Sequence, residues 1–126
     1  MTRHYVILGA PRTKKTSNRV VRLRGKKAGR PLVLPSKAWA TWCRFAVIDT
    51  AYVFGSAVSV PVNCTATFYR DANRGDAVGY YQGLADLLQK RGVIANDRLI
   101  VSWDGSRLAV DRDRPRVEIT LTEVAG

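Results

Sequence analysis

The sequence predicts one α+β domain, in which two helices pack on a mixed, partly antiparallel sheet. Alternating apolar residues indicate strands near 58–70 and after Pro115, and apolar residues at helical spacing indicate helices over 36–53 and 77–91. A length of 126 residues is typical of one domain. Because no internal repeat or linker interrupts the pattern, residues 1–126 are treated as a single unit.

The first part of the chain predicts a strand, a long basic segment and a helix. Residues 4–9 are typical of a strand that ends before Pro11. The basic stretch 12–30 lacks periodicity, so we expect a long loop or loose hairpin of the kind that often binds ligands. After an extended piece at 31–35, Ser36 is expected to cap a helix that buries its apolar positions, namely Ala38, Trp42, Phe45, Ala46 and Val53.

The second part predicts a strand, a helix and three further strands. Asp76 is expected to cap the helix over 77–91, and Gly92 is expected to end it. The predicted buried stripe of this helix is Val78, Tyr81, Ala85 and Leu88, which leaves Tyr80 free for a dimer or DNA contact. Residues 99–103 and 107–110 predict a hairpin joined through Asp104 and Gly105, and a last strand follows Pro115.

The positive charge is concentrated in the first part of the chain. The chain has 21 Lys+Arg against 10 Asp+Glu, a net charge of +11. Residues 1–48 carry 12 basic residues and no acidic one, whereas residues 49–126 carry 9 basic and 10 acidic residues. A polyanion is the expected partner, nucleic acid before an anionic membrane. No apolar run reaches about 18 residues, so we expect no membrane span and a cytoplasmic protein.

The few histidines and cysteines argue against zinc and thiol chemistry. His4 is the single histidine, and Cys43 and Cys64 have neither a metal-ligand spacing nor a redox spacing. We expect two buried free thiols. A metal ion in this chain would be a hard one held by carboxylates.

Asp76 and Asp97 are the carboxylates best placed for metal-dependent chemistry. Each also has a structural interpretation, Asp76 as a helix N-cap and Asp97 as a turn residue. Gln82 and Asp86 share a helix face with Lys90, and Asp86 could instead form a surface pair with that lysine. Among the other acidic residues, Asp71 could assist the site, whereas Asp111 and Asp113 are expected to form a solvated turn that pairs with its own arginines.

The segments Phe68–Asp76 and Leu84–Asp97 resemble the core of the RusA-type Holliday junction resolvases. The shared pattern is a strand, a basic loop, an acidic helix start, an Asp-x-Leu, a glycine stop and an Asn-Asp turn. The resemblance implies a RusA-like fold and a homodimeric endonuclease that makes paired nicks in a four-way DNA junction. It would depend on Mg²⁺, with Mn²⁺ as an alternative ion.

The resemblance also implies roles for particular residues. Asp76 and Asp97 match metal-binding aspartates of the family. Val78 stands where the family has a third aspartate, and Gln82 stands where it has a lysine. The expected solution is a rebuilt site in which Asp86 or Asp71 replaces the missing carboxylate, with Asp76, Asp86 and Asp97 as the catalytic set.

The expected DNA contacts are mostly cations that bind phosphate without reading sequence. They are Lys14, Lys15, Arg19, Arg22, Arg70, Arg74 and Gln82. Two alternatives stay open. One is a non-catalytic basic protein that binds DNA junctions with a degenerate metal site, and the other is a basic interaction protein, for example one that contacts ribosomal RNA.

Overall fold

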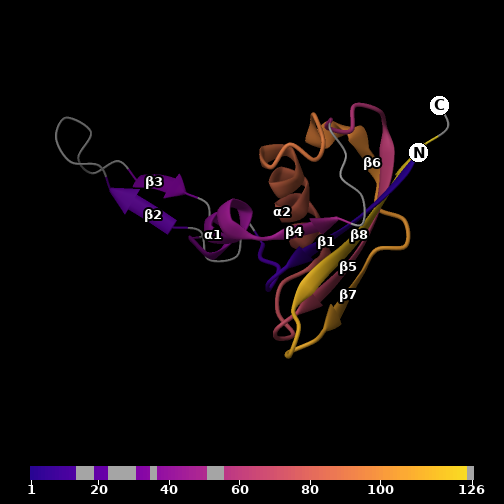
Figure 1. Cartoon of the computed structure of the whole chain (residues 1–126). Helices are drawn as coiled ribbons and strands as arrows, with labels where there is room; N and C mark the ends of the chain where they lie inside the picture. Colours follow the sequence, from indigo (N-terminus) through magenta and orange to yellow (C-terminus); the bar gives the residue numbers. More distant parts are fainter. Residues whose placement is uncertain (14–18, 23–30, 35–36, 51–55, 125–126) are drawn as a thin grey trace.

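The protein is a single α+β domain in which two helices pack on a six-stranded mixed sheet, mostly antiparallel (Figure 1). The computed structural model describes residues 1–13, 19–22, 31–34, 37–50 and 56–124. Along the main path the strand order is β4-β1-β8-β5-β6, and β7 also pairs with β5. Within the described residues, no helix has the length and apolarity needed to cross a membrane. The elements are β1 (Thr2–Leu8), β2 (Arg19–Arg22), β3 (Pro31–Leu34), α1 (Lys37–Phe45), β4 (Ile48–Thr50), β5 (Val62–Arg70), α2 (Ala77–Lys90), the 3₁₀ turn η2 (Asp97–Leu99), β6 (Ile100–Ser102), β7 (Arg107–Val110) and β8 (Arg116–Glu123).

Three antiparallel strands form the centre of the sheet. β8 lies between β1 and β5 and pairs with both along nearly its whole length. In β5 every second side chain is buried, as the predicted alternation requires. The buried apolar residues of β5 and β8 line the core beneath the helices, and they are Val62, Cys64, Ala66, Phe68, Val117, Ile119 and Leu121.

Helix α2 begins and ends close to the predicted positions, but it buries a different face. Asp76 is its N-cap, and Gly92 follows with a φ of +74°, as expected of a helix stop. Val78 is 60 % exposed, whereas Tyr80 is buried with its ring 5.4 Å from that of Phe68. Leu88 is buried as predicted and Tyr81 packs partly buried against the core, but the predicted burial of Val78 and the predicted exposure of Tyr80 are wrong. The buried residues of α2 are Tyr80, Gly83, Leu84, Leu87 and Leu88.

The predicted helix over 36–53 is shorter than expected. It ends at Phe45, and residues 48–50 form β4, which pairs antiparallel with β1. The ladder to β1 satisfies backbone groups that would be unpaired past the end of the helix. Trp42 is buried as predicted, but Phe45 is 70 % exposed. The expected N-cap Ser36 and the stretch 51–53 lie outside the described residues.

The expected hairpin through Asp104 and Gly105 is wrong. β6 and β7 both run parallel to β5, so they are two segments along one edge and do not pair with each other. The Asp104 N–H donates to Asn63 Oδ1 at 2.9 Å, and the Thr65 hydroxyl donates to the Asp104 carbonyl at 2.9 Å. Side chains of β5 thus hold the turn against the sheet and replace part of the ladder.

The basic segment contains a two-stranded hairpin. β2 pairs antiparallel with β3, with Arg22 opposite Pro31, in a sheet separate from the six-stranded one. In Figure 1 this hairpin lies away from the six-stranded sheet, on the side of α1. The pairing agrees with the loose hairpin predicted for this stretch, although Lys14, Lys15 and residues 23–30 lie outside the described part of the chain.

Two glycines of α2 allow the start of the basic segment and α1 to approach the helix closely. A Cβ at Gly83 would lie 2.8 Å from the Arg12 carbonyl oxygen and 3.2 Å from Trp39 Nε1. Trp39 Nε1 donates a hydrogen bond to the Gly83 carbonyl at 3.2 Å, which ties α1 to α2. A Cβ at Gly79 would lie 3.2 Å from Thr13 Cγ2.

Gly83→Ala is predicted to destabilise the protein although alanine favours helices. Alanine gains about 1 kcal/mol over glycine in a helix interior. The overlap with the Arg12 carbonyl, a backbone atom, forces a shift that costs more, so we expect a net loss of about 1–2 kcal/mol. Urea denaturation measures it, with Gln82→Ala on the exposed face as control. A rise in unfolding free energy for Gly83→Ala would show that Arg12 does not pack there.

Candidate functional site

Asp76 lies at the exposed start of α2. Its backbone is extended, with φ −109° and ψ 162°, and its Oδ1 accepts the Gly79 N–H at 2.8 Å. This N-cap satisfies one of the backbone donors that a helix start leaves without a partner. The structural role expected for Asp76 is therefore confirmed, and the carboxylate lies at the positive end of the helix dipole.

Two arginines and Asp71 form an ion-pair cluster just before α2. Arg74 Nη2 donates to both Asp71 oxygens at 2.8 and 2.9 Å, and Arg12 Nη2 lies 3.7 Å from Asp71 Oδ2. Desolvation raises the pKa of Asp71, but the Arg74 hydrogen bond and the charges of Arg12 and Arg74 outweigh it, so the pKa lies below its usual value. Asp71 is thus engaged by arginines.

Arg70 and Tyr80 hold the loop between β5 and α2. Arg70 is 6 % exposed, and its guanidinium donates to the carbonyls of Ala109 and Arg74 at 3.1 Å each. The Tyr80 hydroxyl donates to the same Arg74 carbonyl at 2.8 Å. This placement argues against the expected direct DNA contact by Arg70, because its charge is directed at backbone groups of this loop.

The start of the basic segment lies beside Asp76. Thr13 is buried against Gly79, the residue whose N–H the Asp76 carboxylate accepts, and Arg12 reaches Asp71. Arg12 and Thr13, with which the basic segment begins, therefore lie next to the N-terminal end of α2.

Asp97 lies at the other end of α2. Its backbone N–H donates to Gln89 Oε1, in the last turn of the helix, at 2.8 Å, and Asn96 caps the short η2 turn by accepting the Arg98 N–H. Helix α2 has 14 residues, which is about 21 Å at 1.5 Å per residue. Asp76 and Asp97 are therefore at opposite ends of α2 within one chain.

The expected metal ligands do not converge in one chain. Asp86 lies about 15 Å beyond Asp76 along the axis of α2, since ten residues separate them. Direct Mg²⁺ ligands lie about 2.1 Å from the ion, so Asp76 and Asp97 of one chain cannot hold the same ion. In the described part of the chain, no group of three or more His, Cys, Asp or Glu side chains could bind a metal. One copy of the chain therefore does not fit the expected Mg²⁺.

The other expected DNA contacts have different placements. Arg19 and Arg22 are the two ends of β2, and Lys14 and Lys15 lie outside the described residues. Arg74 is exposed at the N-terminal end of α2, and Gln82 is exposed on the helix itself. Of this set, Arg74 is thus an exposed cation only two residues before Asp76 in the chain.

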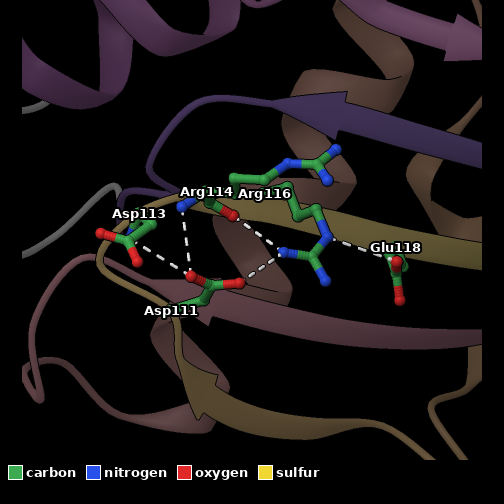
Figure 2. A network of polar contacts seen from close by, with 5 residues as sticks. All are labelled: Asp111, Asp113, Arg114, Arg116 and Glu118. Carbon is green, nitrogen blue, oxygen red and sulfur yellow. Dashed lines mark hydrogen bonds and ion pairs between the residues drawn. The ribbon is translucent and has the colours of Figure 1, made fainter.

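A second polar network lies at the turn between β7 and β8 (Figure 2). Asp111 Oδ1 accepts the N–H groups of Asp113 and Arg114, and Arg116 Nη1 donates to Asp111 Oδ2 at 2.9 Å. The sequence predicts that Asp111 pairs with the arginines of its own turn, but its side-chain partner is Arg116, which also donates to Glu118. The Arg116 hydrogen bond is the main cause that lowers the pKa of Asp111.

Both cysteines are buried free thiols, as predicted. Burial raises the pKa of the Cys64 thiol to about 12. A thiol with such a pKa is protonated at neutral pH and does not act as a nucleophile. Thiolate chemistry by Cys64 is therefore excluded.

No protein-family model matches the sequence, and no curated protein matches it.

Asp76→Ala is predicted to lower the stability of the protein, whereas Asp76→Asn is predicted to leave it nearly unchanged. Asp76→Ala removes the N-cap acceptor, and we expect a loss of about 1 kcal/mol in unfolding free energy. Asp76→Asn retains an oxygen acceptor at the same position, so its loss should be a few tenths of a kcal/mol. Urea denaturation compares the two variants. Equal stability of Asp76→Ala and wild type would contradict the capping role.

Asp111→Asn is predicted to destabilise the protein near neutral pH but not in acid. The pKa of Asp111 is lowered in the folded state, so its ionised form contributes stability above the unfolded pKa of about 3.9. That contribution is lost as the pH falls through the lowered folded pKa. The melting-temperature difference between wild type and Asp111→Asn should thus be largest near pH 7 and vanish near pH 2.

The control for this variant is Asp113→Asn, because Asp113 enters the network through its backbone N–H. Its melting-temperature difference from wild type should stay small throughout. A difference for Asp111→Asn that does not depend on pH would contradict the charge pairing with Arg116.

Proposed function

We propose that this protein is a Mg²⁺-dependent, structure-selective endonuclease that resolves four-way DNA junctions by nicking paired strands. The observation that carries the proposal is the position of Asp76. Its exposed carboxylate stands at the start of α2, and the basic segment leaves the domain from Arg12 and Thr13 beside the same turn. A phosphate backbone bound to that segment would therefore lie within reach of a carboxylate suited to a hard metal ion.

The charge distribution supports a DNA substrate. From Arg12 to Lys37 the chain carries ten basic residues and no acidic residue. Two copies of such a segment could neutralise ten or more phosphates. The binding constant should then fall with roughly the −0.9 power of salt concentration for each contact. This term gives affinity for any DNA, so preference for a junction must come from shape.

The metal site of the proposal requires a second copy of the chain. Enzymes that hydrolyse phosphodiesters without histidine or cysteine chemistry usually use a metal ion held by converging carboxylates. Since Asp76 and Asp97 lie at opposite ends of α2, Asp97 of one copy would have to meet Asp76 of another. A two-fold dimer with the two α2 helices antiparallel would form two such sites, which is the number needed for paired nicks.

The alternative is a DNA-binding protein without catalysis. Val78, at the position of the family's third aspartate, is 60 % exposed and cannot ligate a metal. Asp76 already has a structural role as N-cap, and Asp71 is held by Arg74 and Arg12. These observations support a non-catalytic DNA-binding or junction-binding protein with a degenerate metal site as the alternative.

Asp76→Asn and Asp97→Asn are each predicted to lose nicking of a synthetic four-way junction in Mg²⁺. Loss of residues that only support a ligand costs about 10–100-fold, so removal of a ligand should cost about 100-fold or more. A mixture of the two variants with exchanged subunits should regain one nick per junction, because the mixed dimer has one intact site and one without either carboxylate.

Three outcomes would contradict the proposal. Wild type that binds the junction but never nicks it in Mg²⁺ or Mn²⁺ would support the non-catalytic alternative. Variants that cut as well as wild type would exclude these two aspartates. A mixture that stays inactive, although subunits exchange, would exclude a site shared between two copies. Junction binding by gel shift and urea denaturation of each variant control for loss of binding or folding.

A further inference from the structure

An apolar hollow lies between the end of β1 and helix α1. Its volume is about 720 Å³. The Leu8 N–H donates to the Val47 carbonyl at 2.9 Å, which holds the segment after α1 against β1. Three large apolar residues at the hollow are exposed, with Phe45 at 70 %, Val47 at 60 % and Leu8 at 42 %. The lining is completed by Gly9, Ala10, Arg12, Lys37, Ala38, Thr41, Trp42 and Ala46.

Cations border this apolar surface, and none of the described residues that line it is acidic. Arg12 and Lys37 are part of the lining, and the Arg44 guanidinium carbon lies 5.5 Å from the centroid of the Phe45 ring. Arg12 and Lys37 are also the first and last basic residues of the charged stretch that contains β2 and β3. The hollow is thus at the base of the segment expected to hold the phosphate backbone.

An occupant that complements this surface has a flat apolar part and negative charge close to it. A nucleotide with an unpaired base has both features, because its base presents a stacking face and its phosphate an anion. Aromatic side chains next to cations are the common means by which proteins hold single-stranded nucleic acid. A base inside a continuous duplex is already stacked on both faces and cannot enter.

We propose that this hollow captures an unpaired base of branched DNA, with Phe45 as the stacking ring and Arg12, Lys37 and Arg44 close to the flanking phosphates. The inference rests on the proposed function, since it assumes DNA as substrate, and it adds how a branch point is distinguished from duplex. Strands at a branch point offer bases that are easily unstacked. Continuity with the basic segment favours DNA over an acidic, apolar peptide, which the same chemistry would also accept.

The test measures binding in EDTA, where no cleavage occurs. The probe is a duplex that carries one unpaired 2-aminopurine, and the reference is a fully paired duplex of equal length. Wild type should bind the probe more tightly than the reference and quench the 2-aminopurine fluorescence as the base stacks. Phe45→Ala should lose about 5-fold to 100-fold in affinity for the probe, with little change for the paired duplex.

Two further variants separate stacking from general damage. Phe45→Tyr keeps a ring and should bind the probe like wild type. Val101→Ala removes an exposed apolar side chain from β6, at the opposite edge of the sheet from β4, and should bind both duplexes like wild type. Thermal denaturation checks that each variant folds. Because Phe45 is exposed, we expect Phe45→Ala to keep the stability of wild type.

Equal preference for the unpaired base in wild type and Phe45→Ala would overturn the proposal. The proposal would also be overturned if Phe45→Ala kept the preference for the unpaired base but no longer bound a peptide of alternating glutamate and leucine. The hollow would then be a protein-docking site. Since the measurement needs no nicking, a protein that captures the unpaired base but never cuts would contradict the proposed nuclease activity alone.

Discussion

The close contact between the glycine face of α2 and the chain at Arg12 and Thr13 determines where the other parts lie. A side chain at Gly83 would overlap the Arg12 carbonyl oxygen, and one at Gly79 would crowd Thr13. Trp39 of α1 donates a hydrogen bond to the Gly83 carbonyl in the same turn of α2. One short stretch of helix thus positions both the start of the basic segment and the helix that follows that segment.

This contact brings opposite charges together at one end of α2. Arg12 pairs with Asp71, and Arg74 binds both oxygens of Asp71. Asp76, five residues after Asp71, is exposed. Buried groups fix the loop between them, because Arg70 and Tyr80 both donate to the Arg74 carbonyl. Buried polar groups with satisfied hydrogen bonds restrict a loop to one conformation. The loop is therefore held by the sheet and by α2.

Local signals in the sequence were sufficient for β5, β8 and α2 with its caps, whereas tertiary contacts decided where α1 ends and that residues 48–50 form β4. Asp76 and Gly92 mark the ends of α2 because caps depend on a few adjacent residues. Its buried face could not be chosen from periodicity, since stripes through Tyr80 and through Tyr81 both have helical spacing. The Asp104-Gly105 turn was recognised, but its direction depends on Asn63 and Thr65 about forty residues earlier.

The candidate site shows the same division. Sequence spacing singled out Asp76 and Asp97, yet spacing cannot tell whether two residues at the ends of one helix meet within a chain or between chains. The length of α2 excludes a meeting within one chain, because a straight helix of 14 residues holds its ends about 21 Å apart. Any chemistry that uses both carboxylates is then coupled to assembly, so under the proposed function a single copy would bind DNA without cutting it.

The packing of α2 does not explain the valine at position 78, where the resolvases that the sequence resembles have an aspartate. The residue lies in the first turn of α2 and is 60 % exposed, so packing does not require an apolar side chain there. An aspartate at this position would also interact favourably with the positive end of the helix dipole. Neither stability nor helix formation therefore accounts for valine. Under the proposed function, the valine is a chemical difference from the resolvases that the sequence resembles, and nuclease activity would then depend on Asp76 and Asp97.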